Sequence, residues 1–288
     1  MEDADSSKIM TLNDGRNLGF SDFGDPNGKP IIYFHGFPGS RLETQRFNQV
    51  ALANNYRLIT MDRPGMGLSS LDRNRTILST VNDMIAIADY LKIDRFSVIG
   101  HSGGGPFVAA CAYLIPQRIT VAAIVSGMSP FINPETHVGM VRAQLFASKL
   151  VKIFPPLATL MMKITRIMLN KSDKLLEKMI KPLPLIDQNI FRDPVSGKEL
   201  IQSTLEAFRN GVAGTAYEMK ILLNDWGFKL EDIICPVSIW HGAKDSQVPI
   251  SNAKLYAKLI TNSSLHIFED DGHHSLIKNH FVGIVETL

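Results

Sequence analysis

The chain has 288 residues, of which 45% are hydrophobic and 20% are charged, a composition typical of folded rather than disordered proteins. A chain near this length buries about 75% of the surface that its unfolded form exposes, so a stable core needs neither disulfides nor metal ions. Its 30 basic and 28 acidic residues give a formal net charge of +2, and this balance argues against a nucleic-acid partner.

The sequence begins with the acidic segment MEDADSSKIM, which has neither the basic nor the apolar region of a secretory signal. Residues 96–117 contain no Asp, Glu, Lys or Arg, but their three consecutive glycines and two prolines would interrupt a membrane helix. Cys111 and Cys235 have apolar neighbours and no spacing suited to zinc. We therefore expect a cytoplasmic protein with buried, reduced thiols, no stable membrane insertion, no metal and no cofactor.

The first forty residues predict a β-hairpin, because an Asn-Asp-Gly turn at 13–15 separates the apolar segments 9–12 and 18–23. Short apolar runs then alternate with helical patterns. The expected strands are 31–34, 57–61, 96–99 and 119–125, and the expected helices are 41–53, 81–91 and a segment through Cys111. This alternation predicts a parallel sheet covered on both faces. Thr80 and Asp83 are the expected capping-box pair of the second helix.

The alternation stops near Ser129 and resumes near Cys235. The segment between these residues has long helical patterns and few β-branched runs, so we expect an insertion made of helices. The expected later elements are helices over 141–153, 157–168 and 250–260 and strands over 237–240 and 265–268.

Charge is distributed unevenly within this helical insertion. Residues 131–182 include nine basic and three acidic residues, whereas residues 183–232 include five basic and eight acidic residues. We interpret the basic part as a solvated helix face, with contact to anionic lipid as the alternative.

The sequence Gly-His-Ser-Gly-Gly at 100–104 lies between an apolar strand and a helix that starts near Pro106. This is the setting of a nucleophile elbow, in which a sharp turn between strand and helix strains the central residue. Glycines two positions before and after that residue relieve the crowding. A serine needs a base within hydrogen-bond reach, and an imidazole can take and return its proton at neutral pH. Ser102 is therefore the candidate nucleophile.

Four further motifs follow predicted strands, and together with the elbow they make the chain resemble the α/β-hydrolase family, specifically its cap-bearing serine hydrolases. These motifs are HGFPG at 35–39, DRPGMGLS at 62–69, GAKD at 242–245 and DGH at 271–273. The resemblance covers nearly the whole chain. It implies an α/β-hydrolase fold with a mostly parallel, doubly wound sheet, an N-terminal hairpin and a helical cap. We expect a core domain of residues 1–130 and 233–288 and a cap insertion of residues 131–232.

The resemblance also implies a catalytic triad of Ser102, Asp245 and His273, in the family's order of nucleophile, acid and base. Asp245 follows Ser102 by 143 residues and precedes His273 by 28, which leaves room for one helix and one strand before the histidine. His274 competes with His273 as the base. The family places the base directly after a glycine, which favours His273.

The acid also has competitors. A carboxylate near the base would hold the imidazole in the required tautomer and stabilise its protonated form. Glu135, after the sixth strand, is the alternative to Asp245. The aspartates at 270–271 are too near the histidine in sequence to be natural partners.

Attack on a carbonyl carbon creates an oxyanion, and each preorganised donor that stabilises it is worth roughly 3 to 4 kcal/mol. Gly103 follows the candidate nucleophile at the start of a helix, so its backbone N–H is one expected donor. The resemblance assigns the second donor to the backbone N–H of Phe37.

A serine at the elbow, rather than an aspartate, argues against the epoxide-hydrolase and haloalkane-dehalogenase branches of the family. The resemblance then implies a serine hydrolase that cleaves a small to medium carboxylic ester through an acyl-enzyme intermediate. An aminopeptidase, a lactonase or a carbon–carbon bond hydrolase would use the same triad. A hydrolase-like receptor for a small signal molecule is the alternative from a different class. The expected partner is a small-molecule substrate, and the oligomeric state is left open.

The substrate pocket has no motif of its own. Apolar residues at helical spacing are usually core, but four of them are candidates for its lining: Phe146, Phe154, Met161 and Met162. An aminopeptidase must hold a substrate ammonium group with carboxylates. The basic part of the insertion offers only Glu135, Asp173 and Glu177. We therefore expect esters to be better substrates than aminoacyl amides.

Overall fold

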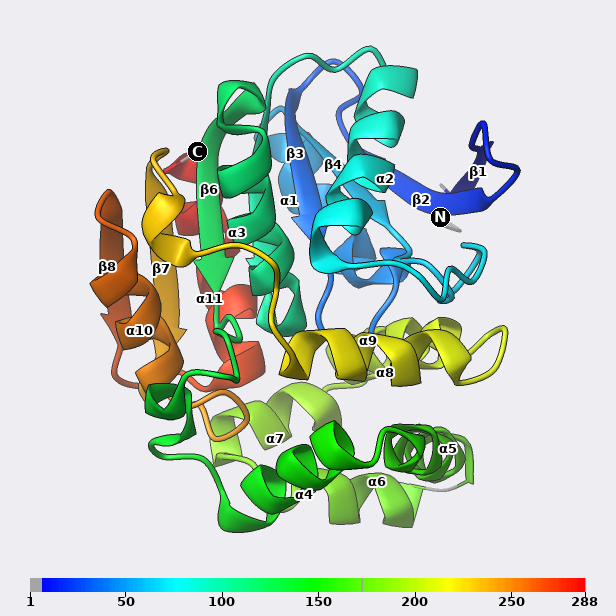
Figure 1. The fold of residues 1–288 in the computed structure, drawn as a ribbon, viewed down its shortest axis with the longest axis vertical. Coiled ribbons are helices and arrows are strands. Elements are labelled where there is room, and N and C mark those ends of the chain that lie inside the picture. Colours follow the sequence, from blue (N-terminus) through cyan, green and yellow to red (C-terminus); the bar gives the residue numbers. More distant parts are fainter. Residues whose placement is uncertain (1–6, 172, 288) are drawn as a thin grey trace.

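The computed structural model describes residues 7–171 and 173–287, and its strands form one eight-stranded sheet in the order β1-β2-β4-β3-β5-β6-β7-β8 (Figure 1). β2 runs antiparallel to both β1 and β4, and all other neighbouring strands are parallel. The mostly parallel sheet is therefore confirmed. The strands are β1 Ser7–Thr11, β2 Asn17–Gly24, β3 Lys29–Phe34, β4 Tyr56–Met61, β5 Phe96–His101, β6 Ile119–Val125, β7 Val237–Gly242 and β8 Ser263–Phe268.

The predicted N-terminal hairpin is also confirmed. Thr11 of β1 pairs with Asn17 of β2, and the turn between them includes Gly15 at φ +82°. Glycine adopts this left-handed conformation without the steric cost that a side chain imposes.

The register of the parallel strands places the motif-bearing loops at one edge of the sheet. Phe34 of β3 pairs with Gly100 of β5, and Val125 of β6 pairs with Trp240 of β7. Each of these residues is near the carboxyl end of its strand. The loops after β3, β5, β6 and β7 therefore open on the same side, which is where open α/β sheets carry their sites.

Helices cover both faces of the sheet, because alternate residues of each central strand point to opposite sides. Ile32 and Phe34 of β3 belong to the core that includes α2, α3 and α10, whereas Ile31 and Tyr33 belong to the core with α1 and α11. The helices of these layers are α1 Asn48–Ala53, α2 Ile77–Tyr90, α3 Gly105–Leu114, α10 Ser251–Leu259 and α11 His273–Glu286.

Between β6 and β7 the chain leaves the sheet and forms six α-helices, which lie beyond the carboxyl edge of the strands (Figure 1). They are α4 Arg142–Ile153, α5 Pro156–Lys171, α6 Asp173–Ile180, α7 Leu185–Arg192, α8 Ser196–Ala207 and α9 Ala213–Leu223. We call residues 131–232 the helical segment. It has a separate apolar core that includes Phe131, Val151, Met162 and Phe208. The assignment of this segment as a cap domain stays a prediction.

The expected capping box of α2 is wrong. The helix begins earlier, at Ile77, and its cap is Thr76, whose Oγ1 accepts from the Ser79 N–H at 3.0 Å. The Ser79 Oγ accepts in turn from the Thr76 N–H at 2.8 Å. Thr80 and Asp83 lie inside the helix. The Asp83 carboxylate forms an ion pair there with the guanidinium group of Arg16, which precedes β2. Serine at the third helical position supplies the reciprocal bond that the sequence interpretation sought from an acidic residue.

Both cysteines are free thiols. Cys111 is buried, as expected, whereas Cys235 is only half-buried. Of the helices in the described part of the chain, none is long and apolar enough to cross a membrane.

Candidate active site

The elbow after β5 has the backbone that a nucleophile turn requires. Ser102 has φ +56°, in the left-handed region, and is the first residue of a short 3₁₀ turn that leads into α3. A Cβ atom at Gly100 would clash with the carbonyl oxygen of Gly104. A Cβ atom at Gly104 would clash with the carbonyl oxygen of Phe34. Only glycine fits at these two positions, so the turn can approach the neighbouring strand β3 closely.

His273 is the first residue of α11, and its Nδ1 lies 2.7 Å from Asp245 Oδ2. The Asp245 Oδ1 accepts from the backbone N–H groups of Gln247 at 2.9 Å and Val248 at 2.8 Å. An ionised carboxylate only accepts hydrogen bonds, so Nδ1 carries the proton and Nε2 is left as the basic nitrogen. Both side chains are buried.

The pair shifts the pKa of both its members. Burial by itself lowers the pKa of His273, but the Asp245 carboxylate outweighs burial and the pKa is raised above its ordinary value. Burial raises the pKa of Asp245, and the interaction with His273 outweighs this effect and lowers it. A protonated imidazole is therefore stabilised at this position, as a general base requires once it has taken a proton.

The competing residues lack the contacts that join His273 to Asp245. His274 is half-buried, its pKa is held well below the ordinary value by burial and by nearby His273, and its Nδ1 has no hydrogen-bond partner among the described residues. Glu135 forms an exposed ion pair with Lys258 at 2.6 Å. The aspartates at 270–271 pair with side chains other than that of His273.

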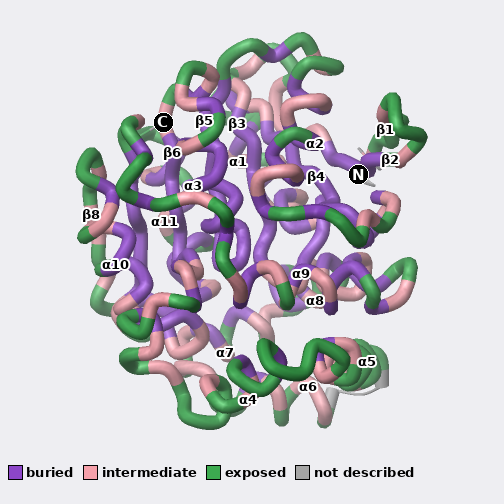
Figure 2. Tube along the Cα trace, in the orientation of Figure 1, coloured by how far each residue is buried: buried purple, intermediate pink, exposed green. Residues whose placement is uncertain are grey.

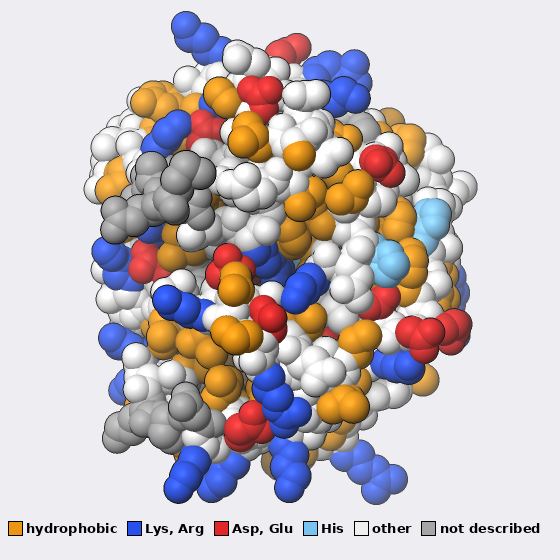
Figure 3. All heavy atoms as spheres, turned by 180° about the vertical axis from the view of Figure 1, so that it is seen from behind, with side chains coloured by type: hydrophobic (Ala, Val, Ile, Leu, Met, Phe, Trp, Pro, Cys, Tyr) orange, Lys and Arg blue, Asp and Glu red, His pale blue; other side chains and the backbone are white. Residues whose placement is uncertain are grey.

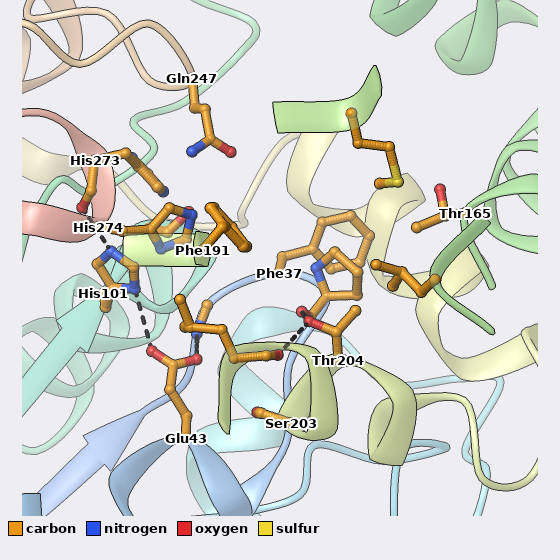
Figure 4. Close-up of a pocket in the computed structure, with 16 residues that line it drawn as sticks. Phe37, Glu43, His101, Thr165, Phe191, Ser203, Thr204, Gln247, His273 and His274 are labelled. Atoms are coloured by element: carbon orange, nitrogen blue, oxygen red, sulfur yellow. Dashed lines mark hydrogen bonds and ion pairs between the residues drawn. The ribbon is translucent and has the colours of Figure 1, made fainter. Parts of the chain in front are cut away.

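Ser102 and His273 both line two cavities, and Phe37 and Gln247 also line both of them. The first cavity, of about 170 Å³, is lined also by Glu43 and His274 (Figure 4). The second, of about 240 Å³, has a more apolar wall that includes Met161. Within the described residues the Ser102 hydroxyl has no hydrogen-bond partner, so it is available to a molecule bound in either cavity.

Three of the four expected lining residues do not line either of these cavities. Met161 lines the second cavity and Met162 is buried in the core of the helical segment. The expectation was wrong for Phe146 and Phe154, which are 69% and 58% exposed. Helix α4 turns Ser148 and Val151 inward instead, so Phe146 faces outward. Apolar spacing predicts a helix face but does not say which neighbour covers it.

The two expected oxyanion donors are close together. A Cβ atom at Gly103 would lie 3.3 Å from the backbone nitrogen of Phe37, so the N–H groups of these residues are neighbours although 66 residues separate them in sequence. Outside the regular elements, no described residue accepts a hydrogen bond from either N–H. Both remain available to a developing oxyanion.

The loop that contains Phe37 is held by a buried arginine that the sequence analysis did not single out. Arg63 donates to the carbonyl oxygens of His35 at 2.6 Å and Gly36 at 3.0 Å. Its guanidinium forms an ion pair with Glu218 of α9, and Arg75 binds the same carboxylate at 2.9 Å. Burial raises the pKa of Glu218, but the two guanidinium groups outweigh burial and lower it to about 2. The motif at 62–69 therefore fixes the loop that contains Phe37 against the helical segment.

A second unpredicted group links the base to that loop. The Glu43 Oε2 accepts from the Gly36 N–H at 2.8 Å, and its Oε1 accepts from the Tyr33 hydroxyl at 2.8 Å. The same Oε1 lies 3.1 Å from His101 Nδ1, and His101 Nε2 lies 3.1 Å from the carbonyl oxygen of His273 (Figure 4). A carbonyl oxygen only accepts, so His101 donates from Nε2 to His273.

Asp187 of α7 is a third residue that sequence reasoning missed. It is fully buried, and its carboxylate accepts from the backbone N–H groups of His273 at 2.7 Å, His274 at 2.9 Å and Ser275 at 3.0 Å. A Cβ atom at Gly272 would clash with this carboxylate. A negative charge is favourable at a helix N-terminus, where the first N–H groups have no partner within the helix. The helical segment thus fixes the start of the helix that begins with the candidate base.

Comparison with known proteins identifies the family. Residues 29–280 match the family described as alpha/beta hydrolase fold. A non-heme chloroperoxidase of Streptomyces lividans is 26% identical over 270 residues, which cover 92% of this chain and 92% of that protein. A dihydrolipoyllysine-residue acetyltransferase component of the acetoin cleaving system of Pseudomonas putida is 34% identical over 132 residues. That match covers 45% of this chain and 35% of the relative's length.

Among solved structures, a thermophilic esterase from Thermogutta terrifontis has a TM-score of 0.69 at 20% identity, with 98% of this chain and 97% of that chain covered. At this identity the likeness shows the fold. The family match covers most of the sequence, and its motifs stand at the carboxyl edge of the sheet, so the chain belongs to the alpha/beta hydrolase fold family.

Proposed function

We propose that the protein is a serine hydrolase that cleaves small to medium carboxylic esters through an acyl-Ser102 intermediate. The observation that carries this proposal is the His273–Asp245 pair, with 2.7 Å between Nδ1 and Oδ2, at the wall of two cavities that Ser102 also lines. A nucleophile, a base and an acid that orients the base are the parts that acyl transfer needs.

In the proposed reaction, His273 Nε2 takes the proton of the Ser102 hydroxyl while Oγ attacks the ester carbonyl carbon. The resulting oxyanion accepts hydrogen bonds from the N–H groups of Phe37 and Gly103. The protonated imidazole then gives its proton to the leaving alcohol, and an acyl-enzyme remains. A water molecule, activated by the same imidazole, hydrolyses it and restores Ser102.

The two cavities suit the two halves of an ester, because its carbonyl carbon stands between an acyl and an alcohol group. The wall of the second cavity includes Met161, Met219 and Leu222. Each acyl methylene buried against such a surface contributes roughly 0.8 kcal/mol, or about fourfold in binding. A cavity of about 240 Å³ limits this gain to short and medium chains.

A series of p-nitrophenyl esters tests the proposal. We expect kcat/KM to rise from the acetate to about the butyrate or hexanoate and then to decline as the cavity is filled. A fluorophosphonate probe should label the wild-type protein at one site and leave Ser102→Ala unlabelled. Equal labelling of the two proteins would refute the assignment of the nucleophile.

An aminopeptidase is the second candidate, because the Glu43 carboxylate lines the first cavity and was not among the acids counted from the sequence. That carboxylate already accepts from Tyr33 and Gly36 and lies 3.5 Å from a guanidinium nitrogen of Arg46. A substrate ammonium would compete with these donors, which favours esters. If prolyl or alanyl amides are cleaved more efficiently than every ester, the protein is an aminopeptidase instead. A receptor would give a single burst of product without further turnover.

A further inference from the structure

Two helices of the helical segment present apolar side chains to the outside. The stripe on α4 consists of Phe146, Leu150 and Ile153, which are 69%, 38% and 81% exposed. The stripe on α5 consists of Leu160, Ile164 and Ile167, which are 53%, 49% and 49% exposed. In each helix the three residues have the spacing i, i+4 and i+7, which places them on one side.

Basic residues flank both apolar stripes, and they have the same spacing in the two helices. Lys149 and Lys152 of α4 and Lys163 and Arg166 of α5 lie three and six residues after the first apolar residue of their stripe, and all four are exposed. The sequence over 136–172 has six Lys and Arg residues and no Asp or Glu. On the opposite face of the molecule, Lys and Arg side chains also project from the end that the helical segment forms (Figure 3). We call these ten residues on the two helices the α4–α5 face.

The inner sides of the same helices serve the candidate active site. Gln144 and Ser148 of α4 and Met161 of α5 line the second cavity, and Thr165 of α5 lines the first. The outward side of both helices is exposed along much of its length (Figure 2). The apolar stripes are thus not needed to close the cavities, and they lie one helix away from them.

The charge of the face selects its partner. Helices with exposed apolar residues among Lys and Arg lie flat in the interface of membranes that contain anionic lipid, where the headgroups neutralise the cations. A second copy of the chain joined by twofold symmetry would bring the same positive charges against each other. α4 has 12 residues, about 18 Å of helix, which is too short to span a bilayer but long enough to lie on it.

From this placement we infer that the α4–α5 face docks the protein on anionic phospholipid surfaces. In the docked protein, α4 and α5 lie on the bilayer, and these helices also line the cavities. Amphiphilic molecules at the bilayer surface therefore reach the cavities over a short path. The docking does not depend on whether Ser102 is the nucleophile.

Vesicle sedimentation with the full-length Ser102→Ala protein tests the docking without hydrolysis of lipid. We expect binding to phosphatidylcholine vesicles that contain about one third phosphatidylserine, little binding to phosphatidylcholine alone, and loss of binding at high salt. Each basic residue contributes about fivefold to the partition constant, so Lys149→Gln/Lys152→Gln should weaken binding about 25-fold. Phe146→Ser/Ile153→Ser should reduce it at least as much.

Matched control variants change similar residues outside the α4–α5 face, at the start of β3 and in the segment that leads into β7. Lys29→Gln/Lys229→Gln removes two exposed cations, and Ile234→Ser removes an apolar side chain that is 74% exposed. Both should bind vesicles as the parent does, and all variants should keep its thermal midpoint. Binding that is equal with and without phosphatidylserine, or unchanged in the face variants, would overturn the inference. A dimer that depends on Phe146 and Ile153, without vesicle binding, would overturn it in favour of a second copy.

Discussion

At the scale of single residues, the candidate base is defined by the groups around it. Burial by itself lowers the pKa of His273 and that of its half-buried neighbour His274. Of these two histidines, only His273 has a carboxylate within hydrogen-bond distance of its Nδ1. The pKa values of these adjacent histidines are therefore shifted in opposite directions. Such opposite shifts indicate which of two neighbouring groups serves as the base, and here they favour His273.

The pH dependence of the reaction should report the raised pKa of His273. Only the neutral imidazole accepts the serine proton, so kcat/KM should fall as pH drops through a pKa above about 6.5. Asp245→Asn removes the charge that raises this pKa, so the acid limb should move to lower pH and kcat should fall by about 10³- to 10⁴-fold. The profile is measured with p-nitrophenyl butyrate. An acid limb that is flat down to about pH 4 would contradict a histidine base.

Substitution of the adjacent histidines separates their roles. His273→Ala should lower kcat by several orders of magnitude, because the serine loses its base. His274→Ala should cost less than about tenfold, since that ring contacts the first cavity but no carboxylate. Steady-state kinetics on the same ester measure both variants. A larger loss for His274→Ala would transfer the role of base to it.

At the scale of elements, the helix that carries the candidate base depends on a helix from another part of the chain. Asp187 of α7 accepts three N–H groups at the start of α11. His273 is the first residue of that helix, so its backbone position depends on this contact. The helical segment therefore contributes to the geometry of the site as well as to the walls of the cavities.

Asp187→Ala should lower both stability and activity. It leaves buried N–H groups without an acceptor, which costs about 2 to 3 kcal/mol of unfolding free energy, and it frees the backbone of His273. Asp193→Ala is the matched control, because Asp193 accepts from the N–H of Ser196 at the start of α8, and not from the helix that begins with His273. It should cost about 1 kcal/mol and leave kcat unchanged. Urea unfolding and ester kinetics measure both variants, and equal kcat values for the two would contradict the positioning role of Asp187.

At the scale of the whole molecule, several buried histidines couple folding to pH. Burial is the largest cause that lowers the pKa of His35, to about 3, and it also lowers those of His101, His241 and His274. Below about pH 6.5 these side chains take up protons in the unfolded chain but not in the folded one. The folded state is then destabilised as pH falls. His273 has the opposite sign, because its raised pKa contributes stability that is present below about pH 6.5 and lost as pH rises through the folded value.

Four histidines with lowered pKa against one with raised pKa give a net loss of stability on acidification. We expect the urea midpoint to fall between about pH 7 and pH 5, with up to about 1.4 kcal/mol per pH unit for each histidine that stays neutral. Reversible unfolding followed by tryptophan fluorescence measures it. A midpoint that is constant or rises over this range would show that the buried histidines are protonated in the folded protein.

The sequence by itself determined the parts of the molecule that depend on neighbouring residues. The Asn-Asp-Gly turn, the alternation of apolar strands with helices and the glycines around Ser102 act over a few residues, so their structures could be predicted. Because parallel strands end at a common edge, the loops that contain Phe37, Ser102, Asp245 and His273 could also be expected to meet.

Only the tertiary structure decided which distant groups complete the site. Asp187 lies 86 residues from His273 along the chain, and Glu218 lies 155 from Arg63, and no local pattern marks either as a partner. The rotation of α4 was undecided for the same reason, since its two apolar sides have similar spacing and only the packing of α5 and α9 selects the one that is buried. Local preferences fix where an element begins and which sides it has, whereas the choice of partner depends on packing between segments far apart in the sequence.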